Sequence, residues 1–61
     1  MTLDELNDYI SKDLELADWM IEANRQFLQT VWDGLKVGGI WGFPADGSAW
    51  EKTEDGFKRI I

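Results

Sequence analysis

The first 33 residues of the chain contain neither proline nor glycine, and the first glycine is Gly34. Apolar residues in this stretch recur at steps of three and four, which is the period of one helix face. Thr2 followed by Glu5 matches the capping box that begins a helix. The sequence therefore predicts a helical part over residues 3–36 and a different kind of structure after it.

Asp13 interrupts the apolar face if that helix is continuous. Ser11 stands just before it and is a good N-cap for a second helix, with Asp13 in the first turn, where the helix dipole favours a negative charge. We therefore expect two helices, roughly 3–10 and 12–36. The alternative is one helix about 50 Å long. A hairpin about 17 Å long would cover a third of it, which implies a dimer or larger oligomer.

The residues after the glycines favour β-structure. Ile40–Phe43 and residues 48–53 are aromatic-rich runs on either side of Pro44–Gly47, which ends in the Asp-Gly pair typical of hairpin turns. The end of the chain, residues 57–61, fits either a third short strand or a helical turn. The predicted fold class is therefore α+β, with one or two N-terminal helices packed on a C-terminal antiparallel β-hairpin and a third short strand left open.

A chain of 61 residues forms one domain at most, here residues 1–61, with a helical part at 3–36 and a hairpin part at 39–61. So short a chain must pack its aromatic residues densely or rely on a partner. The expected core contains four aromatic residues: Trp32, Trp41, Phe43 and Trp50. Of these, Trp41, Phe43 and Trp50 are expected to share one face of the hairpin.

The chain contains no cysteine and no histidine. Disulfides are excluded, and the usual zinc ligands are absent. No nucleophile has an activating base beside it in the sequence, and the carboxylates have little interior in which a pocket could shift their pKa values apart. We expect a protein that is not an enzyme and that uses no cofactor and no metal.

The net charge of −6 belongs entirely to the N-terminal part, because residues 1–24 hold seven acids and one base while residues 25–61 hold five of each. This balance disfavours direct binding to nucleic acid, which depends on Lys and Arg, and favours a basic protein surface. The N-terminus is acidic, unlike a secretory signal, and no 18-residue apolar run could cross a membrane. The expected location is the cytoplasm.

The acids recur along one side of the predicted helix, opposite the apolar face, and few bases stand among them. Neighbouring like charges cost a few tenths of a kcal/mol each, which a mimic of a phosphate backbone would tolerate. A tryptophan on the same side is a candidate hot-spot anchor, although it fits equally well beneath a neighbouring helix. The predicted partner-binding residues are Asp8, Glu15, Asp18, Trp19 and Glu22.

Two resemblances bear on function. The run Trp50–Gly56 followed by Phe57–Arg59 resembles the wing of small winged-helix proteins, in which a W-x-x-T-x-x-G strand leads into a short hydrophobic element. That family implies three helices and a basic recognition helix. More loosely, the whole chain is similar to the small acidic proteins that bacteriophages make to bind and inhibit host enzymes.

The leading hypothesis is a phage-like inhibitor, a nucleic-acid mimic that docks on a larger, basic host protein such as a nucleic-acid-processing or defence enzyme. One alternative is a homo-oligomeric structural module, for example a homodimer, joined through its helices. Another is a residual winged-helix module in transcription or nucleic-acid binding.

Overall fold

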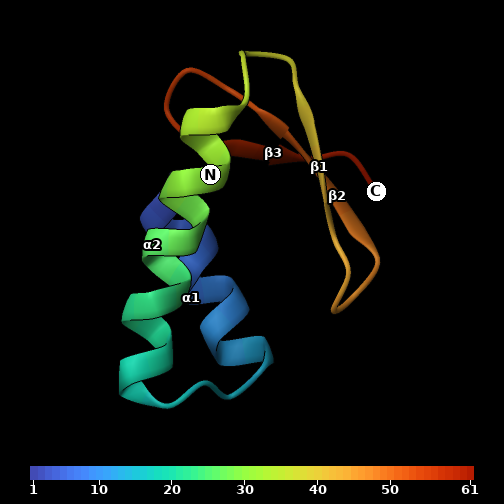
Figure 1. Cartoon of the computed structure of the whole chain (residues 1–61). Coiled ribbons are helices and arrows are strands. Elements are labelled where there is room, and N and C mark those ends of the chain that lie inside the picture. Colours follow the sequence, from blue (N-terminus) through green and yellow to red (C-terminus); the bar gives the residue numbers. More distant parts are fainter.

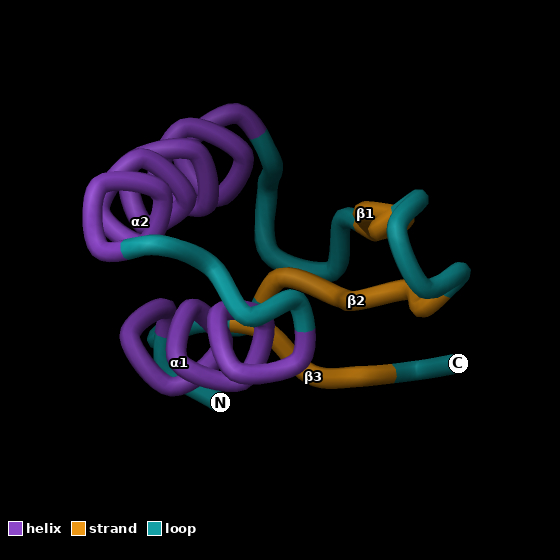
Figure 2. Tube along the Cα trace, turned by 90° about the horizontal axis from the view of Figure 1, so that it is seen from below, coloured by secondary structure: helices purple, strands orange, loops and turns teal.

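The computed structural model describes all 61 residues as two helices followed by a three-stranded antiparallel sheet (Figure 1). The strands lie in the order β1-β2-β3, and both helices lie on one side of the sheet (Figure 2). The predicted α+β fold is confirmed, and the helical part consists of two helices. The elements are α1 (Leu3–Asp13), α2 (Asp18–Gly34), β1 (Ile40–Phe43), β2 (Ser48–Lys52) and β3 (Phe57–Arg59).

Helix α1 begins at the predicted capping box. The Thr2 hydroxyl accepts a hydrogen bond from the Glu5 backbone N–H at 3.2 Å, and the Glu5 carboxylate accepts one from the Thr2 N–H at 2.8 Å. The hydrogen bond from the Thr2 backbone is the main reason that the pKa of Glu5 lies below its usual value. Because folding favours the ionised carboxylate, its stabilising contribution is present at neutral pH and is lost as the pH falls through the acid range.

The break between the helices comes later than predicted. Ser11 lies inside α1 and is buried, while the N-cap of α2 is Ala17, whose side chain caps nothing. The prediction that Ser11 caps a helix starting at residue 12 is therefore wrong. Helix α1 instead ends in a Schellman motif, in which Glu15 adopts a φ of +52° and the Leu16 N–H donates to the Ser11 carbonyl at 3.0 Å. Since the chain reverses here, a dimer built on one long helix does not arise.

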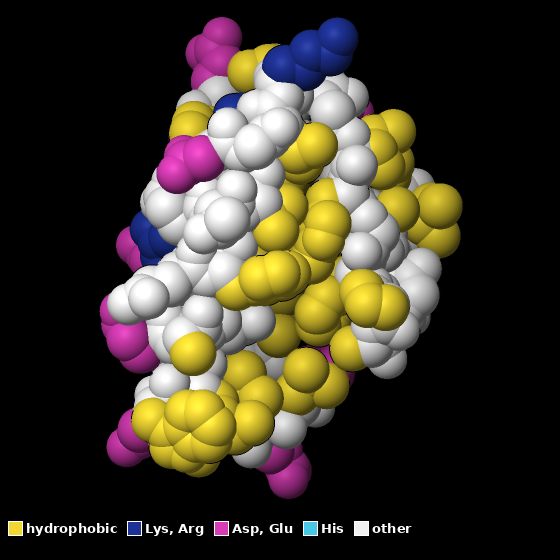
Figure 3. Space-filling view, viewed as in Figure 1, with side chains coloured by type: hydrophobic (Ala, Val, Ile, Leu, Met, Phe, Trp, Pro, Cys, Tyr) yellow, Lys and Arg dark blue, Asp and Glu magenta, His cyan; other side chains and the backbone are white.

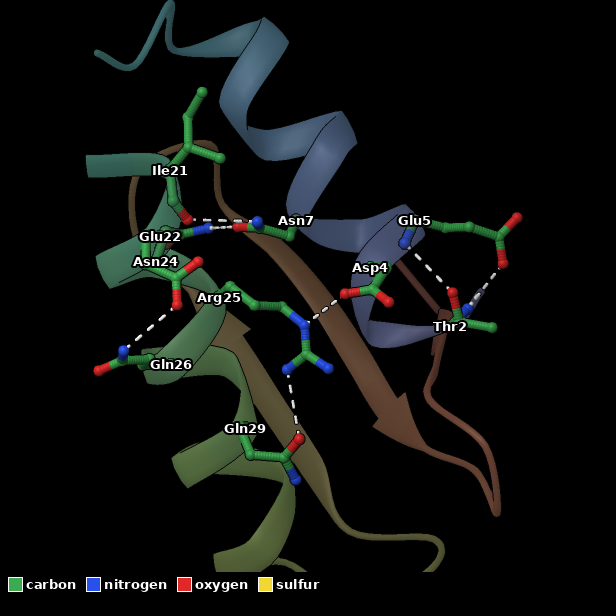
Figure 4. Close-up of polar contacts among 10 residues, drawn as sticks. All are labelled: Thr2, Asp4, Glu5, Asn7, Ile21, Glu22, Asn24, Arg25, Gln26 and Gln29. Carbon is green, nitrogen blue, oxygen red and sulfur yellow. Dashed lines mark hydrogen bonds and ion pairs between the residues drawn. The ribbon is translucent and has the colours of Figure 1, made fainter. Parts of the chain in front are cut away.

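Polar contacts fix the register of the helix pair (Figure 4). The Asn7 side chain, which is buried, donates to the Ile21 carbonyl at 3.2 Å and accepts from the Asn24 amide at 2.7 Å. Beside it, the Arg25 guanidinium pairs with the Asp4 carboxylate across the two helices. Because a buried amide left unpaired is costly, these contacts favour this one alignment of α1 and α2.

The β-hairpin forms as predicted, with residues 44–47 as its turn. Gly47 has a φ of +73°, which explains the glycine in the Asp-Gly pair. Trp41 lies directly opposite Trp50, and Phe43 follows two residues after Trp41 on the same face. The predicted aromatic face is therefore confirmed, and it is the face that meets the helices.

The core differs in part from the one expected. Trp50 is buried, whereas Trp32, Trp41 and Phe43 are half-buried and pack against the core from outside. The end of the chain forms a third strand, and this places Phe57 at the centre with no exposed surface. The buried apolar residues come from both helices and from two strands: Leu3, Leu6, Ile10, Leu28, Trp50 and Phe57.

A buried lysine joins the C-terminus of α2 to the sheet. The Lys52 ammonium donates to the backbone carbonyls of Trp32 at 2.7 Å and Leu35 at 2.6 Å, and it lies 3.7 Å from the centre of the Trp32 ring. The Trp32 indole N–H in turn donates to the carbonyls of Thr53 and Gly56 in the loop between β2 and β3. Lys52 thus gives the Leu35 carbonyl a partner at the end of α2 and adds a second donor to the Trp32 carbonyl, which also accepts from the Leu35 N–H at 3.3 Å.

Candidate protein-binding surface

Four of the five predicted partner-binding residues lie close together in the structure. Glu15 is in the loop between the helices, and Asp18, Trp19 and Glu22 follow in the first two turns of α2; all four are exposed. Asp8 is also exposed, but it lies on α1, so the acids do not form the single helical stripe that the sequence suggested. The stripe is divided between two antiparallel helices.

The acids at this end of α2 have no basic partner. The two ion pairs of the structure join Lys12 to Asp8 at 2.9 Å and Arg25 to Asp4. Glu22 accepts only a hydrogen bond from the neutral Gln26 amide, at 3.3 Å. The carboxylates of Glu15, Asp18 and Glu22 therefore keep their full negative potential toward solvent, while Asp8 is partly neutralised.

Trp19 is the most exposed tryptophan, with 73% of its surface accessible. At about 100° per residue, it lies between the acidic side of α2, with Asp18 and Glu22, and the apolar side, with Met20 and Phe27. Figure 3 shows hydrophobic side chains gathered at the lower end of α2 with acidic side chains on both sides of them. A large indole in this position offers an apolar anchor inside an acidic rim.

An apolar groove lies beside Trp19 and was not anticipated from the sequence. It encloses about 310 Å³ and is lined mainly by apolar residues of the interhelical loop and α2: Leu16, Trp19, Met20, Ala23, Asn24 and Phe27. Met20 is 38% exposed, and Phe27 is 49% exposed. The hairpin contacts the middle of α2 through an edge-to-face pair of Trp41 and Phe27, with ring centres 5.9 Å apart, and the side of α2 that carries Trp19 and Met20 stays exposed.

One backbone feature singles out Glu15. It is the only non-glycine residue with a positive φ, a conformation in which a side chain costs roughly 1 kcal/mol or more relative to glycine. Glycine is the residue usually found at this position of a Schellman motif. Strain of this kind concentrates at functional sites, which favours the assignment of Glu15 to the candidate surface.

This strain gives a testable expectation. Glu15→Gly should raise the free energy of unfolding by about 1 kcal/mol, because glycine adopts the left-handed conformation without steric cost. Glu15→Ala is the matched control: it also removes the carboxylate but keeps the Cβ atom. Urea unfolding followed by circular dichroism compares the two, and equal stability of the Gly and Ala variants would contradict the assignment of strain.

Other kinds of site find little support. No group of three or more Asp, Glu, His or Cys side chains is placed to hold a metal ion. A second hollow, about 340 Å³, lies over Trp50 and Phe57, where Arg59 donates to the Tyr9 hydroxyl at 3.2 Å, and it contains no pairing of a nucleophile with a base. Neither helix is long and apolar enough to cross a membrane.

Residues 50–59, the stretch that resembles a wing, form β2, a loop and β3. Two helices precede the sheet, one fewer than a winged helix requires, and the single base of α2, Arg25, is bound to Asp4. Searches of protein-family profiles, of curated proteins and of solved structures each found no match to this chain. Its function is therefore inferred from its own surface.

Proposed function

We propose that the chain is a non-catalytic binding protein whose acidic end of α2 docks on a basic surface of another, larger protein and so blocks or modulates it. The observation that carries the proposal is the placement of Trp19, 73% exposed, beside carboxylates that have no basic partner. Tryptophan is enriched among the residues that dominate binding energy, and such residues are surrounded by a rim that excludes water. Asp18 and Glu22 supply part of that rim.

The charge distribution suits a target that normally binds nucleic acid. A basic groove attracts phosphates by long-range electrostatics, and a compact protein with a net charge of −6 would compete for the same field. Complementary charge acts mainly on the rate of association, whereas a buried anchor acts mainly on dissociation. The proposed division of roles is therefore that the carboxylates of Glu15, Asp18 and Glu22 guide the encounter and that Trp19 holds the complex.

This division of roles predicts separate kinetic effects. With a partner isolated by pull-down from host lysate, Asp18→Lys combined with Glu22→Lys should slow association about tenfold or more at low salt, and binding of the unmodified chain should weaken as salt rises past ~0.15 M, where the Debye length is about 8 Å. Trp19→Ala should speed dissociation about 30-fold or more, as expected for a hot-spot residue. Surface plasmon resonance measures both rates.

The control for charge is Glu54→Lys combined with Asp55→Lys, in the loop between β2 and β3 at the opposite end of α2 (Figure 1). It changes the net charge by the same amount at a remote position and should slow association only slightly. Equal slowing by the two double variants would mean that overall charge, rather than this surface, governs binding. Unchanged kinetics in Trp19→Ala would remove the proposed anchor.

A further inference from the structure

The two edges of the sheet differ in whether another segment of the chain forms hydrogen bonds with them. At the β3 edge, Phe57 exchanges two hydrogen bonds with Met1: its N–H donates to the Met1 carbonyl at 2.8 Å, and the Met1 ammonium donates to its carbonyl at 2.9 Å. A bridge between Thr2 and Gly56 continues this pairing. The N-terminal residues therefore close part of that edge, whereas no segment pairs with the outer edge of β1.

The outer edge of β1 presents free backbone groups at two residues. The Lys52 N–H donates to the Gly39 carbonyl, and hydrogen-bonded and non-hydrogen-bonded pairs alternate along an antiparallel ladder. Ile40 and Gly42 consequently direct their N–H and C=O groups away from β2. In agreement, the residue opposite Gly42, Ala49, offers its carbonyl to Ile60 on the β3 side at 2.9 Å.

This edge lacks some of the features that keep such edges from pairing. Natural proteins protect free edges with very short strands, charged side chains, proline or a cover. β1 is short, with four residues, and Pro44 follows it, but Ile40–Phe43 contains no charged residue and no proline, and Ile40 is 60% exposed. Trp41 of this strand contacts Phe27, a residue of the apolar groove, with the two ring centres 5.9 Å apart. Figure 3 shows hydrophobic side chains between α2 and β1.

We infer that an extended segment of the basic partner adds to the outer edge of β1 as a fourth strand, with alternate apolar side chains facing Phe27 and Met20 of α2. This inference rests on the proposed function, because it names the mode by which the partner binds. β-strand addition of this kind obtains affinity from main-chain hydrogen bonds and specificity from side-chain pockets. Figure 2 shows α2 on the side of the sheet nearest β1, where it would flank an added strand.

Charge fixes the chemistry of the segment. The chain runs up α2 and back down β1, so the C-terminal end of β1 points toward the N-terminal end of α2 (Figure 1). Glu15 and Asp18 do not line the groove, but they are next in sequence to Leu16 and Trp19, which do. A segment with Lys or Arg at the end beyond Phe43 would direct those charges toward this acidic end of the molecule. A second copy of the chain, itself at −6, would bring acids to acids and is disfavoured.

The test uses synthetic peptides as probes. The first has three lysines followed by Val-Ser-Val-Ser-Val, which suits an antiparallel fourth strand with its basic end toward the acidic N-terminal end of α2. The second has the same composition in reverse order. Titration of the ¹⁵N-labelled chain should shift the amide signals of Ile40 and Gly42 and the indole signal of Trp19. Methylation of the peptide nitrogens on the bonding side should weaken binding about tenfold or more, since each loses a hydrogen bond.

Variants of the chain distinguish strand addition at β1 from binding to the acidic surface alone. Gly42→Pro removes one outward N–H from an edge strand, a position where proline is tolerated, and should weaken the first peptide about fivefold while sparing the fold. Asp18→Lys combined with Glu22→Lys should weaken it similarly. Shifts confined to residues 15–22, insensitive to N-methylation, would overturn strand addition while leaving the acidic surface in place.

Two further outcomes would also overturn the inference. If the Ile40 and Gly42 amides become protected from hydrogen exchange as the concentration of the chain alone rises, a second copy occupies the edge. If neither peptide shifts any signal while the isolated partner still binds, the partner uses the acidic end of α2 without adding a strand. Failure of both the peptides and the partner would instead count against the proposed function.

Discussion

Replacing Phe57 with alanine is expected to remove most of the stability of the fold. The Phe57 side chain has no exposed surface, and its ring lies 6.0 Å from that of Trp41 at the junction of sheet and helices. Large-to-small changes of this kind in a core cost about 3–5 kcal/mol. Domains have only about 5–15 kcal/mol of stability, and one of 61 residues belongs at the low end of that range.

Thermal unfolding followed by circular dichroism measures this effect. Val37→Ala serves as the control, because Val37 is 61% exposed in the loop before β1 and should change stability by less than about 0.5 kcal/mol. If Phe57→Ala melted at the temperature of the unmodified chain, the third strand would not contribute to the core. The assignment of β3 as part of the structural centre would then be wrong.

Replacing Lys52 with methionine is expected to destabilise the fold by about 2–3 kcal/mol. Methionine retains much of the apolar stem, but the carbonyls of Trp32 and Leu35 lose a charged donor, and hydrogen bonds to charged groups contribute about 1.5–3 kcal/mol each. Removing the desolvation cost of the ammonium offsets part of that loss. Lys58→Met, at an exposed position of β3, is the matched control and should be nearly neutral.

Chemical denaturation measures the free energy of unfolding of each variant. If this free energy depends equally steeply on denaturant concentration in both variants, the shift in midpoint gives their difference in stability directly. The loss should appear first at the C-terminus of α2, where hydrogen exchange would speed up near Trp32 in the Lys52 variant alone. A Lys52→Met variant as stable as Lys58→Met would contradict the role of this ammonium as the cap of α2.

Much of the fold could be predicted because its signals are local. A capping box needs only Thr2 and Glu5 at the correct spacing, and the turn at residues 44–47 needs only the backbone freedom of Gly47 beside an aspartate. The alternation of Trp41 and Phe43 followed from the two-residue period of a strand. None of these features depends on what lies elsewhere in the chain.

The remaining features depend on contacts between distant residues. The helix break lies beyond Ser11, which is buried within α1, at a turn in which Glu15 adopts a backbone conformation that residues other than glycine disfavour. In the sequence, Lys52 resembles any lysine of a strand. Its role depends on the end of α2, whose Trp32 carbonyl accepts a hydrogen bond from the Lys52 ammonium. Phe57 likewise gave no sign of its burial, since the last five residues contain two bases and no clear period.

The sequence predicted which residues form the candidate surface, but it did not predict the groove beside them. The sequence located the surplus acids and left open whether Trp19 packs beneath a neighbouring helix; the structure leaves it exposed. The apolar groove depended on where the hairpin crosses α2, which periodicity cannot specify. The breadth of the apolar face was the one available signal, because a hairpin with such short strands could not cover all of α2.

The most direct test of the central claim is site-specific photo-cross-linking in a cell lysate. A benzophenone amino acid replaces Ala23, which lines the groove beside Trp19, in one variant and Lys58 in the other, and the adducts are identified by mass spectrometry. The predicted result is a cross-link from position 23 to a protein with a basic surface, lost on addition of excess unmodified chain and weakened at high salt. Cross-links to the same protein from position 58 but not from position 23, or a partner as acidic as this chain, would contradict it.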